Sequence, residues 1–315
     1  FTCKVYKKIM KILFHVGVGN KDRPERWTAI GGFFNDLGDS LEKLGHKCAY
    51  FCHSAATQRI RSNKLLVSDE VYKINDTNPD IIFTWNGISE GDQKMIEIYG
   101  RKKFIFAELG FFDHYSTCYF DACGTNSVSM NVVEDLDNVE LDNTLFESIQ
   151  KKYIKPRLHD KDYIFVPLQC EGDTQITKLS PFKTMYELLD YVLTIYTNSN
   201  VDILYKPHPQ FSPKIPKSKR LIKVSGDVHS YIPYADKVIG INSTVLFETL
   251  LYHQRLITCG IGLPSRRFLD DNERKKFIIN CYDKQINQSD LDNVDIIKNS
   301  WLYKEILRRS NLEVG

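Results

Sequence analysis

Short apolar runs alternate with amphipathic stretches along almost the whole sequence, and this alternation constrains the fold more than any other feature. The first half contains four strand-like runs, at 11–19, 47–53, 79–87 and 103–110. Helical spacing of apolar residues is found at 27–46, around 68–73 and at 91–102. A β–α–β succession predicts a parallel sheet with helices on both faces, because parallel neighbours need a crossover that is usually a helix.

The same pattern restarts after residue 160. Strand-like runs lie at 163–169, 201–209, 220–226, 236–243 and 255–262, and helical stretches at 180–199, 227–235 and 244–254. A chain of 315 residues exceeds the usual size of one domain. We therefore predict two doubly wound α/β domains sharing a cleft, residues 1–150 and 151–295. The amphipathic helix at 296–315 is expected to pack back onto the first domain.

The composition argues against several classes of protein. With 42 basic and 40 acidic residues the net charge is +2, which does not favour a general nucleic-acid-binding protein. No apolar run approaches the ~20 residues that a membrane-spanning helix needs, and residues 1–9 lack the apolar core of a signal peptide. The eight cysteines show no spacing typical of a zinc site. We expect free thiols in a reducing compartment, and therefore a cytoplasmic protein.

Polar residues follow several predicted strands, and open α/β sheets bind ligands beyond the carboxyl ends of their strands. Asn242, Ser243 and Thr244 follow the strand that ends at Ile241 and begin a helix, where free backbone N–H groups favour an anion. Glu248 lies one turn further on, where a carboxylate can reach ribose hydroxyls. An ordinary helix cap with a solvated glutamate is the alternative.

Two more strand ends of the second half carry candidate groups. Lys206 and His208 stand in the run Lys-Pro-His-Pro, and proline fixes φ and biases the preceding residue toward extended backbone. The prolines should hold His208 rigidly, and Lys206 can neutralise a phosphate; a structural turn is the alternative. Gln169 ends another strand, and the loop after it brings Asp173 to the cleft, unless Asp173 only caps the next helix.

The first domain contributes a denser polar group. Glu108 ends a predicted strand and is followed by Asp113, His114 and Asp121 among aromatic residues. Such a density is typical of an active-site lining, and a buried glutamate paired for structural reasons is the alternative.

A glycine-containing run, HVGVGN, follows the first predicted strand. It contains Gly17 and Gly19 but no third glycine at the spacing of a dinucleotide-binding fingerprint, so an oxidoreductase is not favoured. We expect Gly17, Gly19 and Asn20 to let acceptor or donor approach the backbone.

The order and spacing of these elements resemble those of the capsule-polysaccharide synthesis glycosyltransferases, which include the bacterial β-Kdo transferases. The resemblance covers about 103–262 and is more distant for the sialyl- and polysialyltransferases. Five motifs carry it: Glu108-x-Gly110; Asp121, Gly124, Asn126 and Ser127; Gln169-x-x-x-Asp173; Lys206 to Pro209; and Asn242-Ser243-Thr244 with Glu248.

This resemblance implies a GT-B fold, with the acceptor bound by residues 1–150 and the donor nucleotide by 151–295. It places His208 on the donor phosphate and Asp173 as a nucleophile in a retaining double displacement, with Glu108 as the acid/base partner. The other donor or phosphate residues are then Lys206, Gln169, Asn242, Ser243, Thr244 and Glu248. Acceptor or cleft residues are Gly17, Gly19, Asn20, Asp113, His114, Asp121 and Asn126.

The predicted function is transfer of a sugar from a nucleotide-sugar donor, CMP-Kdo or similar, to a hydroxyl of a growing surface glycan. Lys206, His208 and the helix start can stabilise the leaving phosphate, and no Asp-x-Asp follows a predicted strand. No metal or other cofactor is therefore expected. The expected partners are the nucleotide sugar, the glycan acceptor and, by peripheral association, other glycan-assembly enzymes; no nucleic acid is expected.

Other functions stay open on sequence alone. A UDP- or GDP-sugar could be transferred with inversion, with Glu108 or Asp113 as the base. A sugar epimerase of two Rossmann-like halves would also place histidines and carboxylates in a cleft. A glycan- or nucleotide-binding module without catalysis is a different class, and its stacking platform would be the aromatic residues Phe111, Phe112, Tyr115, Tyr119 and Phe120.

Overall fold

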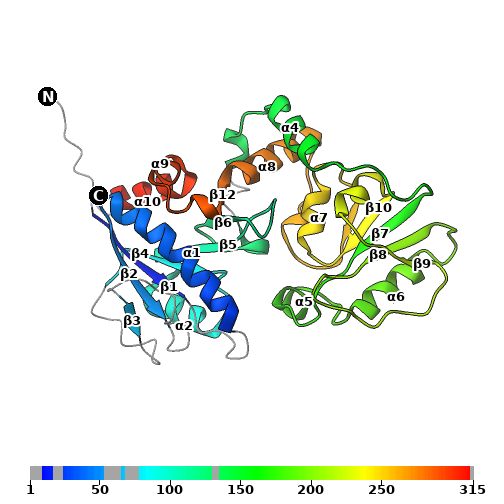
Figure 1. Ribbon diagram of the computed structural model, residues 1–315, viewed down its shortest axis with the longest axis horizontal. Coiled ribbons are helices and arrows are strands. Elements are labelled where there is room, and N and C mark those ends of the chain that lie inside the picture. Colours follow the sequence, from blue (N-terminus) through cyan, green and yellow to red (C-terminus); the bar gives the residue numbers. More distant parts are fainter. Residues whose placement is uncertain (1–8, 17–23, 53–64, 68–77, 130–134, 313–315) are drawn as a thin grey trace. The chain divides into compact units, whose positions relative to one another are not determined.

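The computed structural model describes residues 9–16, 24–52, 65–67, 78–129 and 135–312. Gly17, Gly19, Asn20 and the helix expected around 68–73 lie outside these ranges. The chain divides into unit 1, residues 1–134 and 281–315, and unit 2, residues 135–280 (Figure 1). The first boundary falls at 134 rather than at the expected 150, because α4 (Asn143–Tyr153) belongs to unit 2. The second boundary falls at 280 rather than at the expected 295, because the residues from 281 onward belong to unit 1.

Unit 1 is built on a seven-stranded sheet with the order β12-β6-β5-β4-β1-β2-β3. Five strands are parallel: β1 (Lys11–His15), β2 (Lys47–Cys52), β3 (Leu65–Val67), β4 (Ile81–Trp85) and β5 (Phe104–Leu109). Two antiparallel strands extend one edge, β6 (Thr117–Asp121) and β12 (Gln285–Asn287). The predicted parallel sheet is thus present, and β3, β6 and β12 add to it.

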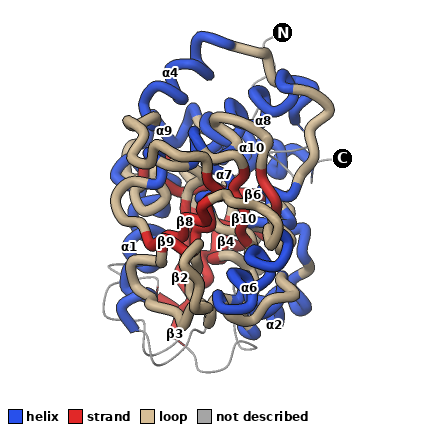
Figure 2. The backbone as a smooth tube through the Cα atoms, turned by 90° about the vertical axis from the view of Figure 1, so that its right-hand side faces the viewer, coloured by secondary structure: helices blue, strands red, loops and turns tan. Residues whose placement is uncertain are grey.

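Helices cover both faces of this sheet. They are α1 (Pro24–Lys43), α2 (Glu90–Tyr99), α9 (Val294–Asn299) and α10 (Trp301–Leu312). One buried cluster joins α1, α9 and α10 to one face, with Phe14, Phe34, Leu37, Phe83, Ile297, Leu302 and Ile306 among its members. On the other face, Met95 of α2 packs with Leu13, Ile82, Phe104 and Phe106. Figure 2 shows α1 and α2 on opposite sides of β2 and β4.

Unit 2 has a five-stranded, fully parallel sheet with the order β11-β10-β7-β8-β9. Its strands are β7 (Tyr163–Pro167), β8 (Asp202–Lys206), β9 (Leu221–Lys223), β10 (Lys237–Gly240) and β11 (Leu256–Thr258). Its helices are α4, α5 (Thr174–Leu179), α6 (Met185–Ile195), α7 (Thr244–Thr249) and α8 (Asp271–Lys284), the last of which runs into unit 1.

The strands of unit 2 are apolar on both sides because helices and turns pack on both. Met185, Leu188 and Val192 of α6 lie against Val166 and Ile203 on one face. On the other face, Phe165 and Leu204 pack with Tyr231, Ile232 and Leu246. Burying each of these large side chains contributes roughly 1.5–3 kcal/mol before the loss of chain entropy is subtracted.

Each sheet has one topological switch point, where successive connections leave in opposite directions. In unit 1 it lies between β1 and β4, and in unit 2 between β7 and β10. Crevices at such points are where open α/β sheets bind ligands. Within the described ranges, no helix is both long and apolar enough to span a bilayer.

Candidate functional site

The carboxyl edge of the unit 2 sheet gathers the predicted donor residues. β7 is followed by Gln169, β8 ends at Lys206, and β10 is followed by Asn242. β7 lies between β8 and β10 with all three strands parallel, so these strand ends meet at one edge of the sheet. The candidate donor site therefore lies within unit 2.

Gln169 and Asn242 bridge the switch point itself. The Gln169 amide N–H donates to the Asn242 side-chain oxygen (3.1 Å), and the Asn242 backbone N–H donates to the Gln169 side-chain oxygen (3.3 Å). Asn242 also donates from Nδ2 to the Ile261 carbonyl (3.2 Å). Both amides thus tie neighbouring loops together and shape the edge on which a ligand would lie.

Ser243 occupies the cap position of α7 but does not cap it. Its backbone is extended (φ −67°, ψ 157°), and its side chain makes no cap hydrogen bond. Within the described part of the chain, Ser243 Oγ is buried and has no hydrogen-bond partner. A buried hydroxyl without a partner is costly, so this group is better suited to a ligand than to an ordinary helix cap. Thr244 follows it as the first helical residue and is partly buried.

His208 is held in one tautomer by its surroundings. The Gln210 backbone N–H donates to His208 Nδ1 (3.2 Å), and Cys170 Sγ lies 3.3 Å from the same nitrogen. Because Nδ1 accepts, the ring proton of neutral His208 is on Nε2. Burial and the nearby Lys206 ammonium lower the pKa of His208, and Asp173 opposes them. The ring is therefore a neutral N–H donor at neutral pH, and not the imidazolium that a charge-neutralising role requires.

Asp173 begins α5 at the same edge. Its backbone N–H donates to the Cys170 carbonyl (3.0 Å), and its own carbonyl accepts from Ile176 and Thr177. The side chain is exposed and close enough to act on the pKa of His208. The backbone of Asp173 therefore begins α5, which is the position that a helix-capping aspartate would occupy. Its exposed carboxylate lies near His208.

Glu248 lies on α7 and pairs with a residue that sequence reasoning missed. Its Oε2 is 3.7 Å from His229 Nε2, and both side chains are largely buried, 14% and 7% exposed. His229 Nδ1 is 2.8 Å from Tyr252 Oη. No spacing in the sequence indicates this cluster, because His229 belongs to a short 3₁₀ turn (Val228–Ser230) before β10.

In unit 1, Glu108 lies near the end of β5, opposite Tyr119 of β6. Its Oε1 accepts from the backbone N–H of Leu109 (2.9 Å), and the side chain is partly exposed. Burial, followed by the charge of Glu108, raises the pKa of Tyr119 well above its usual value. The predicted carboxylate is therefore at a strand end, beside a buried phenol.

The turn after Glu108 explains the glycine in its motif. A Cβ on Gly110 would clash with Thr117 Oγ1, and Gly110 N–H donates to the Thr117 carbonyl (2.9 Å). His114 Nδ1 lies 2.9 Å from the Gly110 carbonyl, and burial lowers the pKa of this histidine. Asp113 has a left-handed backbone (φ 51°) and accepts from Ser116 in the same turn.

Asp121 and Asn126 stabilise the backbone of unit 1. Asp121 is fully buried, and its Oδ1 accepts from the backbone N–H groups of Cys123 (2.7 Å) and Gly124 (3.1 Å). Asn126 has φ 53°, and its backbone N–H donates to Tyr119 Oη (2.9 Å). The carboxylate expected to line the cleft thus holds a turn inside unit 1.

A buried His15–Asp92 pair at the unit 1 switch point was also missed. His15 ends β1, and its Nδ1 lies 2.9 Å from Asp92 Oδ1, to which Thr84 Oγ1 also donates (2.5 Å). Ser89 donates to Asp92 Oδ2 from both Oγ (2.6 Å) and its backbone N–H (3.1 Å). Burial alone raises the pKa of Asp92, but the hydrogen bonds from His15, Ser89 and Thr84 hold it below its usual value. The Ser89-x-x-Asp92 spacing in the sequence indicates a helix cap but not the contacts of Asp92 with His15 and Thr84.

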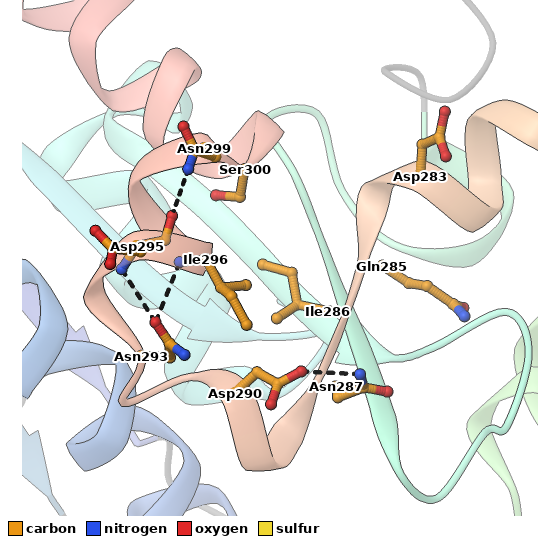
Figure 3. Close-up of a pocket in the computed structure, with 10 residues that line it drawn as sticks. All are labelled: Asp283, Gln285, Ile286, Asn287, Asp290, Asn293, Asp295, Ile296, Asn299 and Ser300. Atoms are coloured by element: carbon orange, nitrogen blue, oxygen red, sulfur yellow. Dashed lines mark hydrogen bonds between the residues drawn. The ribbon is translucent and has the colours of Figure 1, made fainter.

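One open pocket of unit 1 has none of the predicted site residues in its lining (Figure 3). It is lined by β12, α9 and the segments beside them, with Asp283, Asp290 and Asp295 among its polar residues. Several of its polar groups bond one another, as in Asn287 to Asp290 (2.9 Å). Among the residues that the structure describes, no three His, Cys, Asp or Glu side chains group as metal ligands would.

Comparisons with known proteins agree with this description. One relative, Protein FixF of Sinorhizobium fredii (strain NBRC 101917 / NGR234), is 28% identical over 195 residues, which is 57% of this chain and 48% of FixF. The aligned region thus spans about half the length of this curated relative.

Two solved structures of Thermosulfurimonas dismutans KpsC share the fold. The one titled beta Kdo 2,7 transferase is 20% identical and has a TM-score of 0.54, covering 90% of this chain and 99% of that one. The one titled beta Kdo 2,4 transferase is 12% identical and has a TM-score of 0.50, covering 86% and 90%. With the two parallel-sheet units, this likeness confirms the predicted GT-B fold.

Residues 142–265 match the family model described as Capsule polysaccharide biosynthesis protein. That range contains every strand end of the candidate donor site, from Gln169 to Glu248. Over this range, most of unit 2, the chain is similar to capsule polysaccharide biosynthesis proteins, and its fold is that of the GT-B structures above.

Proposed function

We propose that this chain transfers a sugar from a nucleotide-sugar donor to a hydroxyl of a growing surface glycan. Unit 2 binds the donor at the carboxyl edge of β7, β8 and β10, and unit 1 contributes the acceptor groups. One observation carries the proposal: groups suited to a phosphate gather at this edge. They are the Lys206 ammonium acting on His208, the His208 Nε2–H and the buried hydroxyl of Ser243, which has no hydrogen-bond partner among the described residues.

The proposed donor is CMP-Kdo or a similar CMP-activated acidic sugar. Support comes from the family match of unit 2 and from the fold shared with KpsC, whose structures are titled as beta Kdo transferases. A UDP- or GDP-sugar is the competing donor. Thermal shifts with CMP, UDP and GDP separate these possibilities, and a larger shift with CMP is expected.

His208 acts in this proposal as a neutral hydrogen-bond donor. As the bond to the sugar breaks, the departing phosphate gathers negative charge. The Nε2–H of His208, the Ser243 hydroxyl and the Lys206 ammonium stabilise that charge more in the transition state than in the ground state. Since α7 has only six residues, these side chains contribute more than its dipole does.

The carbon–oxygen chemistry is proposed as a double displacement. The Asp173 carboxylate attacks the anomeric carbon while the bond to the phosphate oxygen breaks, and the phosphate leaves with the electron pair. The acceptor hydroxyl oxygen then attacks the same carbon, the bond to Asp173 breaks, and the hydroxyl proton passes to a carboxylate base, for which Glu108 is the candidate. Two inversions retain the anomeric configuration.

Intact-protein mass spectrometry tests the nucleophile. Incubating the Glu108→Gln variant with donor alone should give a protein heavier by one sugar, with the added mass mapped to Asp173 by peptide analysis. Asp173→Asn should lose the adduct and most turnover. Full activity of a correctly folded Asp173→Asn variant would exclude the double displacement, while transfer by a direct route would still support the broader function.

The proposal requires neither a metal ion nor another cofactor, because the stabilising groups all belong to the chain. Activity should therefore persist in excess EDTA, and loss of activity that Mg²⁺ restores would overturn this part.

We also propose a cytoplasmic site of action, with peripheral association with other glycan-assembly enzymes. Free thiols are found at Cys48, Cys118, Cys123, Cys170, Cys259 and Cys281, which suits a reducing compartment.

A further inference from the structure

A cluster of ionisable side chains lies beside α7 in unit 2. His229 is buried, with Nδ1 2.8 Å from Tyr252 Oη and Nε2 3.7 Å from Glu248 Oε2. The ring of Tyr153 lies 5.2 Å from the ring of His229. The backbone of His229 is also fixed, since its N–H donates to Asp227 Oδ1 (2.9 Å).

The contacts of His229 define which nitrogen carries the proton. Burial raises the pKa of Tyr252 well above its usual value, so the phenol stays protonated and can donate to Nδ1. Nε2 then carries the ring proton and faces the Glu248 carboxylate. The histidine therefore links a fixed phenol to the carboxylate and limits the orientations that the Glu248 side chain can adopt.

Glu248 is placed to reach the part of a nucleotide next to its phosphate. It lies four residues after Thr244, so the two share one face of α7 a turn apart. A phosphate held by Ser243 has the ribose as its next group, and a carboxylate can accept hydrogen bonds from ribose hydroxyls. We propose that His229 is a positioning residue that holds Glu248 to recognise the ribose 2′-hydroxyl of the donor. This inference rests on the proposed function of unit 2.

Calorimetric titration of the full chain with CMP and 2′-deoxy-CMP tests the inference without any turnover. The pairs UMP/dUMP and GMP/dGMP are titrated in parallel, so that the ratio of ribonucleotide to deoxyribonucleotide affinity can be measured with whichever base the chain binds. The wild-type chain should prefer the ribonucleotide by about tenfold or more, the value of a hydrogen bond to a charged group. Glu248→Gln should reduce that preference.

Two amide replacements of His229 separate positioning from mere support of the fold. The terminal amide nitrogen of glutamine takes the place of Nε2, so His229→Gln should keep the contact to Glu248 and most of the preference. Asparagine reaches only the place of Nδ1, so His229→Asn should keep the contact to Tyr252 and lower the preference to about twofold or less. Matching melting temperatures of the two variants control for folding.

The outcomes are distinct. A wild-type chain that binds no nucleotide contradicts the proposed function and this inference with it. Nucleotide binding without a ribose preference, or a preference unchanged in His229→Asn, overturns the inference and leaves the proposed function standing. Equal losses in His229→Asn and His229→Gln also contradict it, because the glutamine variant retains the group that faces Glu248.

Discussion

His208 shows how two prolines and one backbone amide can set the chemistry of a side chain. Pro207 and Pro209 flank it at the end of β8, and the Gln210 N–H fixes the proton on Nε2. With its pKa lowered by burial and by Lys206, the ring is a hydrogen-bond donor over the whole neutral range. The role in leaving-group stabilisation that we propose for His208 therefore does not depend on a positive charge.

Removing this donor should slow sugar transfer with little effect on the fold. His208→Ala is expected to lower kcat by about 10²–10³, as for other single transition-state donors. His208→Gln should recover part of the loss, because its amide N–H replaces Nε2–H. Since the pKa of His208 lies below its usual value, kcat should not fall between pH 6.5 and 8 through this group. A His208→Ala variant as active as wild type would refute the role.

Ser243 should respond to substitution in opposite directions for stability and binding. Ser243→Ala removes a buried hydroxyl that has no partner among the described residues, so the free energy of unfolding without ligand should stay the same or rise by up to about 1 kcal/mol. Nucleotide affinity should fall about tenfold or less, the range of one hydrogen bond. Denaturant unfolding and calorimetry measure the two; a large loss of stability would assign Ser243 a structural role.

At the scale of elements, α2 is fixed by the Asp92 carboxylate. His15, Thr84 and Ser89 all bond to it, and removing one partner of a buried charged pair costs about 3–5 kcal/mol. Asp92→Asn should therefore destabilise unit 1 by roughly 3 kcal/mol in urea unfolding. Glu90→Gln on the same helix is the control, because Glu90 is exposed and its pair with Lys94 is worth at most a few tenths of a kcal/mol.

The same carboxylate gives stability a defined dependence on pH. The pKa of Asp92 is lower in the folded chain than its usual value of 3.8, so folding favours the ionised form. Its contribution is complete above the unfolded pKa and is lost as the pH falls through the folded pKa. Acid unfolding of Asp92→Asn should consequently show a shallower loss of stability below pH 4 than that of wild type, and an identical slope would contradict this assignment.

The turn between β5 and β6 requires the glycine of the Glu-x-Gly motif. Gly110→Ala would place a Cβ against Thr117 Oγ1, and overpacking of this kind costs typically 1–3 kcal/mol. Gly32→Ala in α1 meets no atom of the described residues within 4 Å and should instead stabilise the fold by roughly 0.5–1 kcal/mol. Thermal unfolding of both variants tests the contrast, and equal effects would show that Thr117 moves aside easily.

The sequence predicts every parallel strand except the three-residue β3, and most helices, because their apolar runs are long enough to be recognised from local sequence alone. β6 does not, because 117–121 lies inside a polar, aromatic segment that reads as a site lining, and its Asp121 carboxylate is buried only once β6 pairs with β5. β12 is three residues long and pairs with β6 from far along the chain. The strand-end motifs could be found from the sequence because they directly follow strands that the local pattern predicts. The pairs His15–Asp92 and His229–Glu248 could not, because their members come together only in the folded units.

The whole molecule consists of two units, each built around a sheet with several parallel strands and a switch point. The candidate donor groups all lie in unit 2, inside the range that matches the capsule polysaccharide biosynthesis family model. Substitutions in unit 2 should therefore change nucleotide binding, while substitutions of the acceptor candidates in unit 1 should change transfer and leave nucleotide binding intact.

Equilibrium dialysis with radiolabelled CMP, UDP and GDP measures this division between the units, using wild type, Lys206→Ala in unit 2 and Glu108→Gln in unit 1. We expect wild type to bind at least one nucleotide, with CMP favoured. Lys206→Ala should weaken that binding about tenfold or more, and Glu108→Gln should leave it unchanged. Absence of nucleotide binding by the folded wild-type chain, or binding that is insensitive to Lys206→Ala, would show that unit 2 does not hold the donor in the way proposed.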